Sequence, residues 1–235
     1  MSGDPRRRLA LALDVDDLVA AVRLARRLRS WFAVAKVGLE LFGAAGPETV
    51  AALVDEDYGV FVDLKLHDIP TTVGRAARVL GALGPTYLTA HAAGGVAMLR
   101  AAVEGAGEAA RSAGVTPATV LGVTVLTSEP RVTPGLVRHR AATAAEAGCG
   151  GVVCAAADLA EARAGAPGLL AVVPGIRPRG VSSDDQARAA DPAQAVAAGA
   201  DVLVLGRAVT GAARPEDVAA GVLAEVEASE GAGRG

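Results

Sequence analysis

The sequence is poor in cysteine, histidine and aromatic residues. It has two cysteines, Cys149 and Cys154, and three histidines among 235 residues, and aromatic side chains make up 3%. A single pair of cysteines in an apolar run forms no disulfide framework, so we expect a reducing compartment. Histidine and cysteine do not have the spacing of a zinc site, and we predict no bound metal. With so few aromatic residues, the core must consist of Val, Leu, Ile and Ala.

Long apolar runs and an excess of positive charge are also missing. No run reaches the ~18 apolar residues of a membrane span. Asp14, Asp16 and Asp17 interrupt the first apolar stretch too early for a signal peptide. The net charge of −3 argues against general nucleic-acid binding. Because 51% of the residues are hydrophobic and 21% are charged, wholesale disorder is excluded. We therefore expect a globular, cytoplasmic protein with no nucleic-acid or membrane partner.

Eight short apolar runs recur along the chain, and each is followed by a longer, alanine-rich segment with helical periodicity. The runs cover residues 9–15, 33–38, 59–65, 87–92, 119–127, 151–155, 169–176 and 201–206. Continuous apolar strands are typical of a parallel sheet that is covered on both faces. Their mean spacing of about 29 residues is close to that of one βα unit. The pattern predicts an α/β fold, a single-domain (β/α)8 TIM barrel over residues 1–235, with an open doubly wound sheet as the alternative.

Helices are predicted between these runs. The first three clear ones cover residues 17–29, 47–56 and 71–83, and the last two begin at Asp191-Pro192 and Arg214-Pro215. Residues 178–191 break the pattern because they are polar and long, so we expect a mobile loop above the seventh strand. We expect the tail, about residues 230–235, to be frayed.

Residues that could carry chemistry stand at the carboxyl end of nearly every predicted strand, where the active sites of such barrels lie. They are Asp14, Lys36, Asp63, Lys65, His91, Thr127, Arg177, Gly206 and Arg207. Burying so many polar groups is costly unless they share a site. Two histidines are expected to stay outside the chemistry: His91 as a hydrogen-bonded structural residue, and His67 packed behind its strand.

The densest polar cluster is FVDLKLHDIPTTV at residues 61–73. Strand alternation places Asp63 and Lys65 on one face, and Asp68 comes just past the strand end. The carboxylates favour the charged form of the Lys65 ammonium group, which makes it a candidate acid or electrostatic stabiliser. A structural ion-pair network at the barrel rim is the alternative, and the presence of Lys36 on the neighbouring strand argues against it.

A second cluster has the chemistry of an anion site. Arg177 and Arg207 follow the seventh and eighth predicted strands, and a guanidinium group suits phosphate oxygens. Gly175 and Gly206 permit the backbone to approach a phosphate group at the strand ends where such barrels often bind one. The alternative is that these glycines only turn the chain and that the arginines are solvated.

In these motifs the chain resembles the orotidine 5′-phosphate decarboxylase family, in its short bacterial form, over roughly residues 9–226. The matching segments are LALDV (11–15), KVGLELF (36–42), FVDLKLHDIPTTV (61–73), HAAGG (91–95), GVTVLTS (122–128), GVVCAA (151–156), PGIRPRG (174–180), DDQAR (184–188) and GRAVT (206–210). The DLKxHDIP motif is highly specific. The resemblance implies a lyase that decarboxylates orotidine 5′-monophosphate to UMP and CO2, the last step of de novo pyrimidine biosynthesis, without a cofactor.

The resemblance also implies residue roles. Lys65, Asp63, Asp68 and Lys36 would form the catalytic network, with Lys65 as the proton donor. Asp68, Ile69 and Thr72 would reach into the neighbouring site of a homodimer. Asp14 would hold the ribose, Thr127 the pyrimidine, and Arg177, Gln186, Gly206 and Arg207 the phosphate and its loop. The full substrate-binding set is Asp14, Lys36, Asp63, Leu64, Lys65, Leu66, His67, Asp68, Ile69, Pro70, Thr71, Thr72, Thr127, Arg177, Gln186, Gly206 and Arg207. Thr71 stands where bacterial members commonly have Asn, which leaves the fine geometry there open.

Two alternative functions are less well supported. A sibling group of barrels uses the same D-x-K-x-x-D motif on sugar phosphates with Mg2+, but its metal needs an acidic residue near the position of Lys36. A catalytically silent barrel that binds a phosphate ligand would have lost a charged group, whereas the network here is complete.

Overall fold

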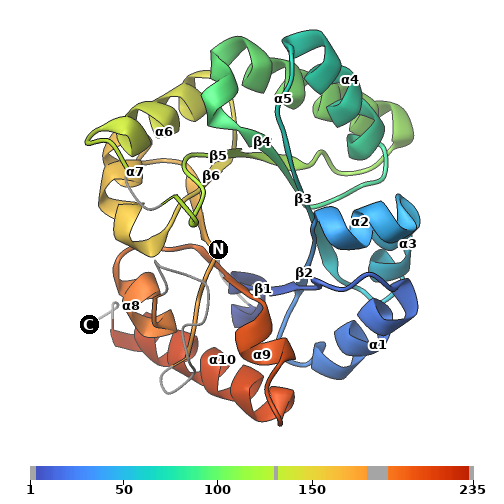
Figure 1. The fold of residues 1–235 in the computed structure, drawn as a ribbon, viewed down its shortest axis with the longest axis vertical. Coiled ribbons are helices and arrows are strands. Elements are labelled where there is room, and N and C mark those ends of the chain that lie inside the picture. Colours follow the sequence, from blue (N-terminus) through green and yellow to red (C-terminus); the bar gives the residue numbers. More distant parts are fainter. Residues whose placement is uncertain (1–3, 130–131, 179–189, 233–235) are drawn as a thin grey trace.

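The computed structural model describes residues 4–129, 132–178 and 190–232, which form a closed barrel (Figure 1). Eight parallel strands pair in chain order, and β8 closes the barrel on β1. The strands are β1 (Leu9–Ala12), β2 (Val34–Val37), β3 (Gly59–Leu66), β4 (Tyr87–His91), β5 (Thr119–Val123), β6 (Gly151–Val153), β7 (Leu170–Val173) and β8 (Val202–Leu205). The predicted (β/α)8 barrel is confirmed, and the open sheet is wrong.

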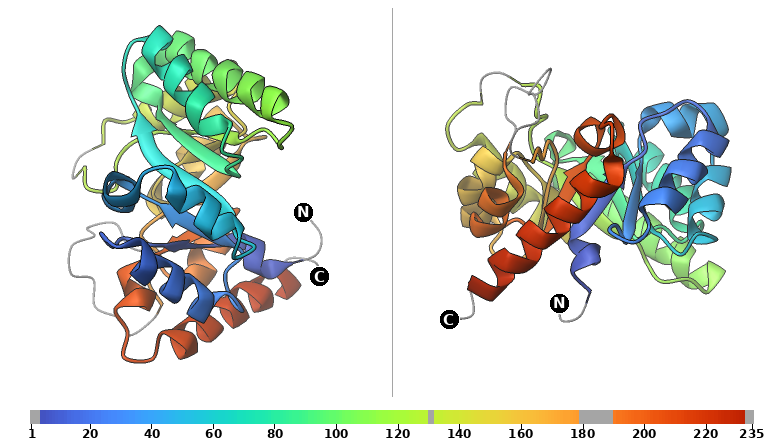
Figure 2. Two further views of the ribbon diagram at one scale, coloured as in Figure 1. Left: turned by 90° about the vertical axis from the view of Figure 1, so that its right-hand side faces the viewer. Right: turned by 90° about the horizontal axis from the view of Figure 1, so that it is seen from below.

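Helices form a ring outside the strands (Figures 1 and 2). The α-helices are α1 (Leu18–Leu28), α2 (Leu39–Ala45), α3 (Glu48–Val54), α4 (Pro70–Gly81), α5 (Gly95–Ala113), α6 (Leu136–Glu146), α7 (Leu159–Gly165), α8 (Pro192–Ala197), α9 (Arg207–Thr210) and α10 (Pro215–Ala232). Three 3-10 turns are η1 (Pro5–Arg8), η2 (Ala92–Gly94) and η3 (Ala156–Asp158). The predicted starts at Pro192 and Pro215 are confirmed, and the Asp191 side chain caps α8 by accepting from two backbone N–H groups.

Some element boundaries differ from the prediction. Helix α2 was not expected, and the helix predicted at residues 47–56 is the shorter α3. Gly46 separates the two because its positive φ of 61° turns the chain after α2. Strands β5 and β7 end earlier than predicted, at Val123 and Val173. The apolar runs mislead here because the loops beyond these strands also bury apolar side chains, Val125 and Ile176 among them.

Apolar side chains fill both the barrel interior and the layer between strands and helices. The interior cluster consists of Ala10, Ala12, Val34, Phe61, Tyr87, Leu121, Val123, Val153, Val172, Val202 and Val204. Within it, the rings of Phe61 and Tyr87 meet edge to face with their centroids 5.7 Å apart. Since the interior is a packed core, polar side chains can gather only beyond it. The η1 turn and the end of α10 lie at the amino-terminal end of the strands, which leaves the carboxyl end for a site (Figure 2).

Helices α4 and α5 approach each other closely because glycines stand at their contact. A Cβ atom at Gly105 would overlap the carbonyl oxygen of Gly74, and one at Gly81 would lie 2.8 Å from the Ala106 carbonyl oxygen. The glycines therefore let the two backbones touch. This contact fixes α4, which begins directly after the D-x-K-x-x-D segment.

Two predicted features fall largely outside the described residues. Of the loop predicted at 178–191, residues 179–189 lie outside them; Ala190 forms a parallel bridge with Ile176. Helix α10 continues to Ala232, so it overlaps the start of the tail predicted to be frayed, and residues 233–235 lie outside the description. Within the described part of the chain, no helix is long and apolar enough to span a membrane.

Candidate active site

Four charged side chains of alternating sign lie in a row at the carboxyl ends of β1, β2 and β3. The Lys36 ammonium lies 3.1 Å from Asp14 Oδ1 and 3.8 Å from Asp63 Oδ2, and Lys65 Nζ lies 2.8 Å from the same Asp63 oxygen. The side chains of Lys36 and Asp63 are each 12% exposed, whereas that of Lys65 is 32% exposed. Each cation thus neutralises a neighbouring carboxylate, and Lys65 is the member of the β3 pair that a ligand can reach.

The backbone of β3 is irregular where it carries this cluster. The register between β3 and β4 shifts between Val62 and Leu66, and Lys65 has a left-handed φ of 51°. A residue with a side chain costs about 1–2 kcal/mol in this conformation. Such strain persists only where surrounding contacts hold it, and it is frequent at functional sites. The expectation that Asp63 and Lys65 share a face is met, through a bulge rather than a regular strand.

Thr89 on β4 holds the bulge and was missed in the sequence analysis. Its hydroxyl accepts a hydrogen bond from the Lys65 backbone N–H at 2.9 Å and donates one to Asp63 Oδ1 at 3.0 Å. The residue is fully buried. Its signal in the sequence is a threonine inside the otherwise apolar run that becomes β4, since a buried hydroxyl needs partners.

Asp68 stands apart from the charged row within this single chain. Its carboxylate accepts a hydrogen bond from the backbone N–H of Ile69 at 2.6 Å, and among the described residues no ion pair joins it to Lys65. Ile69 is 66% exposed, and Pro70, Thr71 and Thr72 are also exposed at the start of α4. The whole segment after β3 therefore faces outward.

The other predicted residues of this motif do not join the cluster. Leu64 and Leu66 pack against the large core cluster between the strands and the helices, away from Lys65. His67 is exposed, and its ring centroid lies 5.4 Å from that of His91. The expectation that His67 packs behind its strand is wrong, because the chain has already left the sheet at that residue.

His91 ends β4 next to this segment. Its Nδ1 atom is buried without a hydrogen-bond partner, so the hydrogen-bonded role that we expected is not seen at this atom. Burial lowers the pKa of His91, and the nearby His67, Arg140 and Lys65 side chains lower it further. His91 therefore favours its neutral form beside the charged row.

A pocket of about 170 Å³ joins Asp14 and Lys36 of the charged row to the two predicted phosphate arginines, and its lining includes neither Asp63 nor Lys65. It is lined by Ala12, Asp14, Lys36, Pro174, Gly175, Ile176, Arg177, Val204, Gly206, Arg207 and Ala208. The Arg177 Nε atom is buried there without a hydrogen-bond partner. An unpaired buried donor is costly, and an anionic oxygen would satisfy it. The structure thus brings Asp14 and Lys36 to one side of a pocket whose other side carries Arg177, Gly206 and Arg207.

Two predicted binding residues remain, Thr127 and Gln186. Thr127 is half-buried in the turn after β5, at the same end of the barrel but not in the pocket lining. Gln186 lies outside the described residues.

The donor set of the pocket is poorly suited to a metal ion. Among residues 4–129, 132–178 and 190–232, no three His, Cys, Asp or Glu side chains gather closely enough to hold one. The Lys36 ammonium lies within 4 Å of both Asp14 and Asp63. A metal ion bound by those carboxylates would face this like charge.

Comparison with known proteins gives one consistent result. The profile of the orotidine 5′-phosphate decarboxylase / HUMPS family matches residues 7–222. The chain is 46% identical over 223 residues to the orotidine 5′-phosphate decarboxylase of Anaeromyxobacter sp. (strain K), covering 94% of this chain and 98% of the relative. It is 44% identical to that of Thermobifida fusca (strain YX), with 93% and 95% covered. The crystal structure of orotidine 5′-phosphate decarboxylase from Lactobacillus acidophilus aligns with a TM-score of 0.76 and 31% identity, covering 94% and 99%. With the strand-end lysines and carboxylates in place, the chain belongs to the orotidine 5′-phosphate decarboxylase / HUMPS family.

Proposed function

We propose that this protein decarboxylates orotidine 5′-monophosphate to UMP and CO2, the last step of de novo pyrimidine biosynthesis, without a cofactor. The observation that carries the proposal is the alternating row of Asp14, Lys36, Asp63 and Lys65 at the strand ends of a member of this family. The two cysteines, Cys149 and Cys154, are both buried and suit a reducing compartment such as the cytoplasm, where we place the reaction.

We assign the role of proton donor to Lys65. When the bond from C6 to the carboxylate breaks, CO2 leaves and the electron pair stays on C6. The adjacent ammonium group is in place before that charge develops and stabilises it as it forms, so no rearrangement is needed. One N–H bond of Lys65 then breaks as the C6–H bond of UMP forms, and the neutral amine regains a proton from solvent. Asp63 directs the ammonium group through its 2.8 Å contact.

The remaining residues would bind the parts of the substrate that do not react. We assign the ribose to Asp14, the pyrimidine to Thr127, and the phosphate to Arg177, Gly206 and Arg207. The pocket that joins Asp14 to the two arginines supports this assignment. Binding energy from the phosphate, remote from C6, then contributes to assembling the reacting end.

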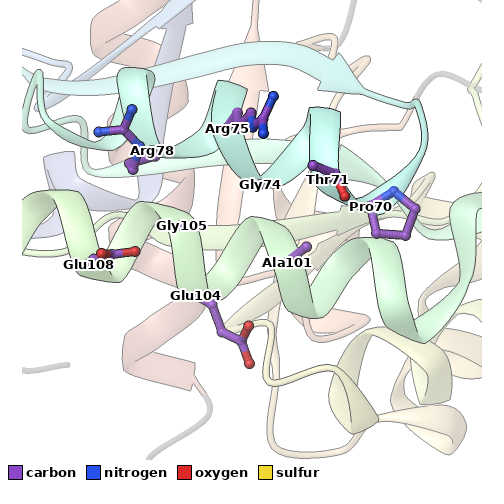
Figure 3. Close-up of a pocket in the computed structure, with 9 residues that line it drawn as sticks. All are labelled: Pro70, Thr71, Gly74, Arg75, Arg78, Ala101, Glu104, Gly105 and Glu108. Carbon is purple, nitrogen blue, oxygen red and sulfur yellow. The ribbon is translucent and has the colours of Figure 1, made fainter.

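We further propose a homodimer in which Asp68, Ile69 and Thr72 complete the partner's site. The outward-facing, partly apolar segment after β3 supports this, as does the groove of about 550 Å³ beside it, between α4 and α5 (Figure 3). One side of the groove carries Arg75 and Arg78 on α4 (Figure 3). The other side carries Glu104 and Glu108 on α5. A two-fold axis parallel to the groove would set the basic side of each copy against the acidic side of the other.

The decisive test of the activity is the loss of ultraviolet absorbance of orotidine 5′-monophosphate with purified protein, with and without EDTA. We expect turnover that survives EDTA and is abolished in Lys65→Ala, with His139→Gln on the exposed face of α6 as a fully active control. Folded protein that leaves the substrate intact, or that acts only on sugar phosphates with Mg2+, would overturn the proposal.

The shared site has its own test. Lys65→Ala and Asp68→Ala chains are each expected to be inactive, and mixing them should restore activity in heterodimers that carry one intact site. If exchange of subunits is demonstrated and no activity returns, the sites are not shared.

A further inference from the structure

We propose that Thr89 is a positioning residue of this site, because its hydroxyl joins Asp63 to the backbone of Lys65 and so sets where the Lys65 ammonium lies. This inference deepens the proposed function and rests on it. Thr89 does not touch the pocket and acts through its two partners.

The direction of each hydrogen bond around Thr89 follows from the donors available. The Lys65 backbone N–H can only donate, so the Thr89 hydroxyl oxygen accepts it at 2.9 Å. The single hydroxyl hydrogen is then free for Asp63 Oδ1, 3.0 Å away. The other oxygen of that carboxylate accepts from Lys65 Nζ at 2.8 Å. The three residues thus form a closed ring of hydrogen bonds that holds both ends of Lys65, its amide and its ammonium group.

The register of the sheet explains why a side chain is needed at this point. Val62 pairs with Leu88, and Leu66 pairs with Ala90. The three residues Asp63, Leu64 and Lys65 therefore face the single residue Thr89 across the ladder. At this point the strands cannot pair residue by residue, and the Thr89 hydroxyl accepts the Lys65 amide hydrogen in place of a backbone carbonyl. It thereby supports the left-handed backbone that turns the Lys65 side chain toward Asp63.

A purely structural threonine would also satisfy buried polar groups, so the test must separate the two roles. Thr89→Val keeps the shape and removes both hydrogen bonds, whereas Thr89→Ser keeps the hydroxyl. We expect Thr89→Val to lower kcat by about 100-fold, the loss that follows a misplaced reacting group, with a much smaller change in KM. Thr89→Ser should recover most of kcat.

The chain offers a direct spectroscopic readout of the lysine. Lys36 and Lys65 are its only two lysines, so protein labelled with 13C at the Cε atom of lysine has two such signals, which are assigned by comparison with Lys65→Ala. We expect Thr89→Val to displace the Cε resonance of Lys65 more than that of Lys36. This measurement needs no substrate, so it decides the positioning role even if orotidine 5′-monophosphate proves not to be the substrate.

The matched control is Thr49→Val. Thr49 on α3 is also fully buried, and its hydroxyl donates to the Gly46 carbonyl at 2.7 Å, away from the site. It should lose stability but keep kcat and both lysine resonances. The proposal is overturned if Thr89→Val keeps its kcat and its Lys65 resonance, or if Thr89→Ser is as inactive as Thr89→Val. If Thr89→Val does not fold, as judged by circular dichroism, Thr89→Ala is measured by the same criteria.

Discussion

The contact between α4 and α5 makes Gly105→Ala a sharp test of how the scaffold supports the site. The new Cβ would overlap the Gly74 carbonyl oxygen and lie 3.1 Å from its carbonyl carbon. Both atoms belong to the α4 backbone, so relief requires the helix to move. Overpacking of this kind costs about 1–3 kcal/mol, and the overlap with backbone places it at the upper end. Alanine recovers about 1 kcal/mol of helix propensity relative to glycine. The net loss is therefore about 2 kcal/mol, which lowers Tm by roughly 4–8 °C in a protein of this size.

Gly107→Ala is the matched control on the same helix. A Cβ there would meet only the Arg111 Nη1 atom, at 3.4 Å, and that flexible side chain can move aside. This variant should equal or exceed the wild type in Tm. Thermal unfolding followed by circular dichroism measures both variants, and orotidine 5′-monophosphate turnover measures the effect on the segment that precedes α4. If Gly105→Ala is as stable as Gly107→Ala, the close contact between the helices does not exist in solution.

Three further predictions concern buried and half-buried groups. The folded state lowers the pKa of His91, so the unfolded chain binds a proton at this residue more readily than the folded chain does. The contribution of His91 to the free energy of unfolding is therefore complete above about pH 6.5, and it is lost as the pH falls from there through the folded pKa. His91→Gln should therefore lose less stability than the wild type between pH 7.5 and 5.5 in urea titrations, whereas His139→Gln should behave as the wild type does. Burial raises the pKa of the Cys149 thiol to about 12, and Cys154 is fully buried, so neither should react with a thiol reagent at pH 8 until urea unfolds the protein; rapid reaction of folded protein would contradict this. Asp201→Ala should lower the free energy of unfolding by about 1 kcal/mol, since its partly exposed carboxylate accepts hydrogen bonds from Arg163 and the Ala171 backbone; an unchanged urea midpoint would refute it.

The barrel and the charged row were predictable from the sequence for a physical reason. Each buried parallel strand must be a continuous apolar run, so a charged residue at its end is conspicuous. Lys36, Asp63 and Lys65 were recognised in this way, and the structure brings each of the two ammonium groups within 4 Å of the Asp63 carboxylate. The pocket that joins Asp14 to Arg177 follows from the closure of the barrel, because closure places β1 beside β8.

What the sequence did not reveal depends on backbone conformation and on contacts between distant residues. Strand alternation predicts that Asp63 and Lys65 share a face, but it does not predict a bulge or a left-handed lysine. Thr89 was overlooked because one threonine hardly changes the apolar character of its strand. Asp68 was predicted to complete the lysine network across a dimer interface, and among the described residues of one chain no ion pair joins it to Lys65. A residue whose proposed partner lies in a second copy of the chain cannot be placed from one chain alone.

Lysine and arginine are distributed differently between the charged row and the proposed phosphate end of the pocket. The chain has two lysines, both in the charged row, whereas arginine supplies the cations at the proposed phosphate end. Arginine is effectively always protonated and presents a planar fork, so it binds phosphate oxygens well but does not give up a proton. Lysine is a compact charge that can lose and regain a proton. Decarboxylation requires the first property at the phosphate and the second at C6. Lysine in the charged row and arginine at the phosphate end are therefore the cations that the proposed reaction requires.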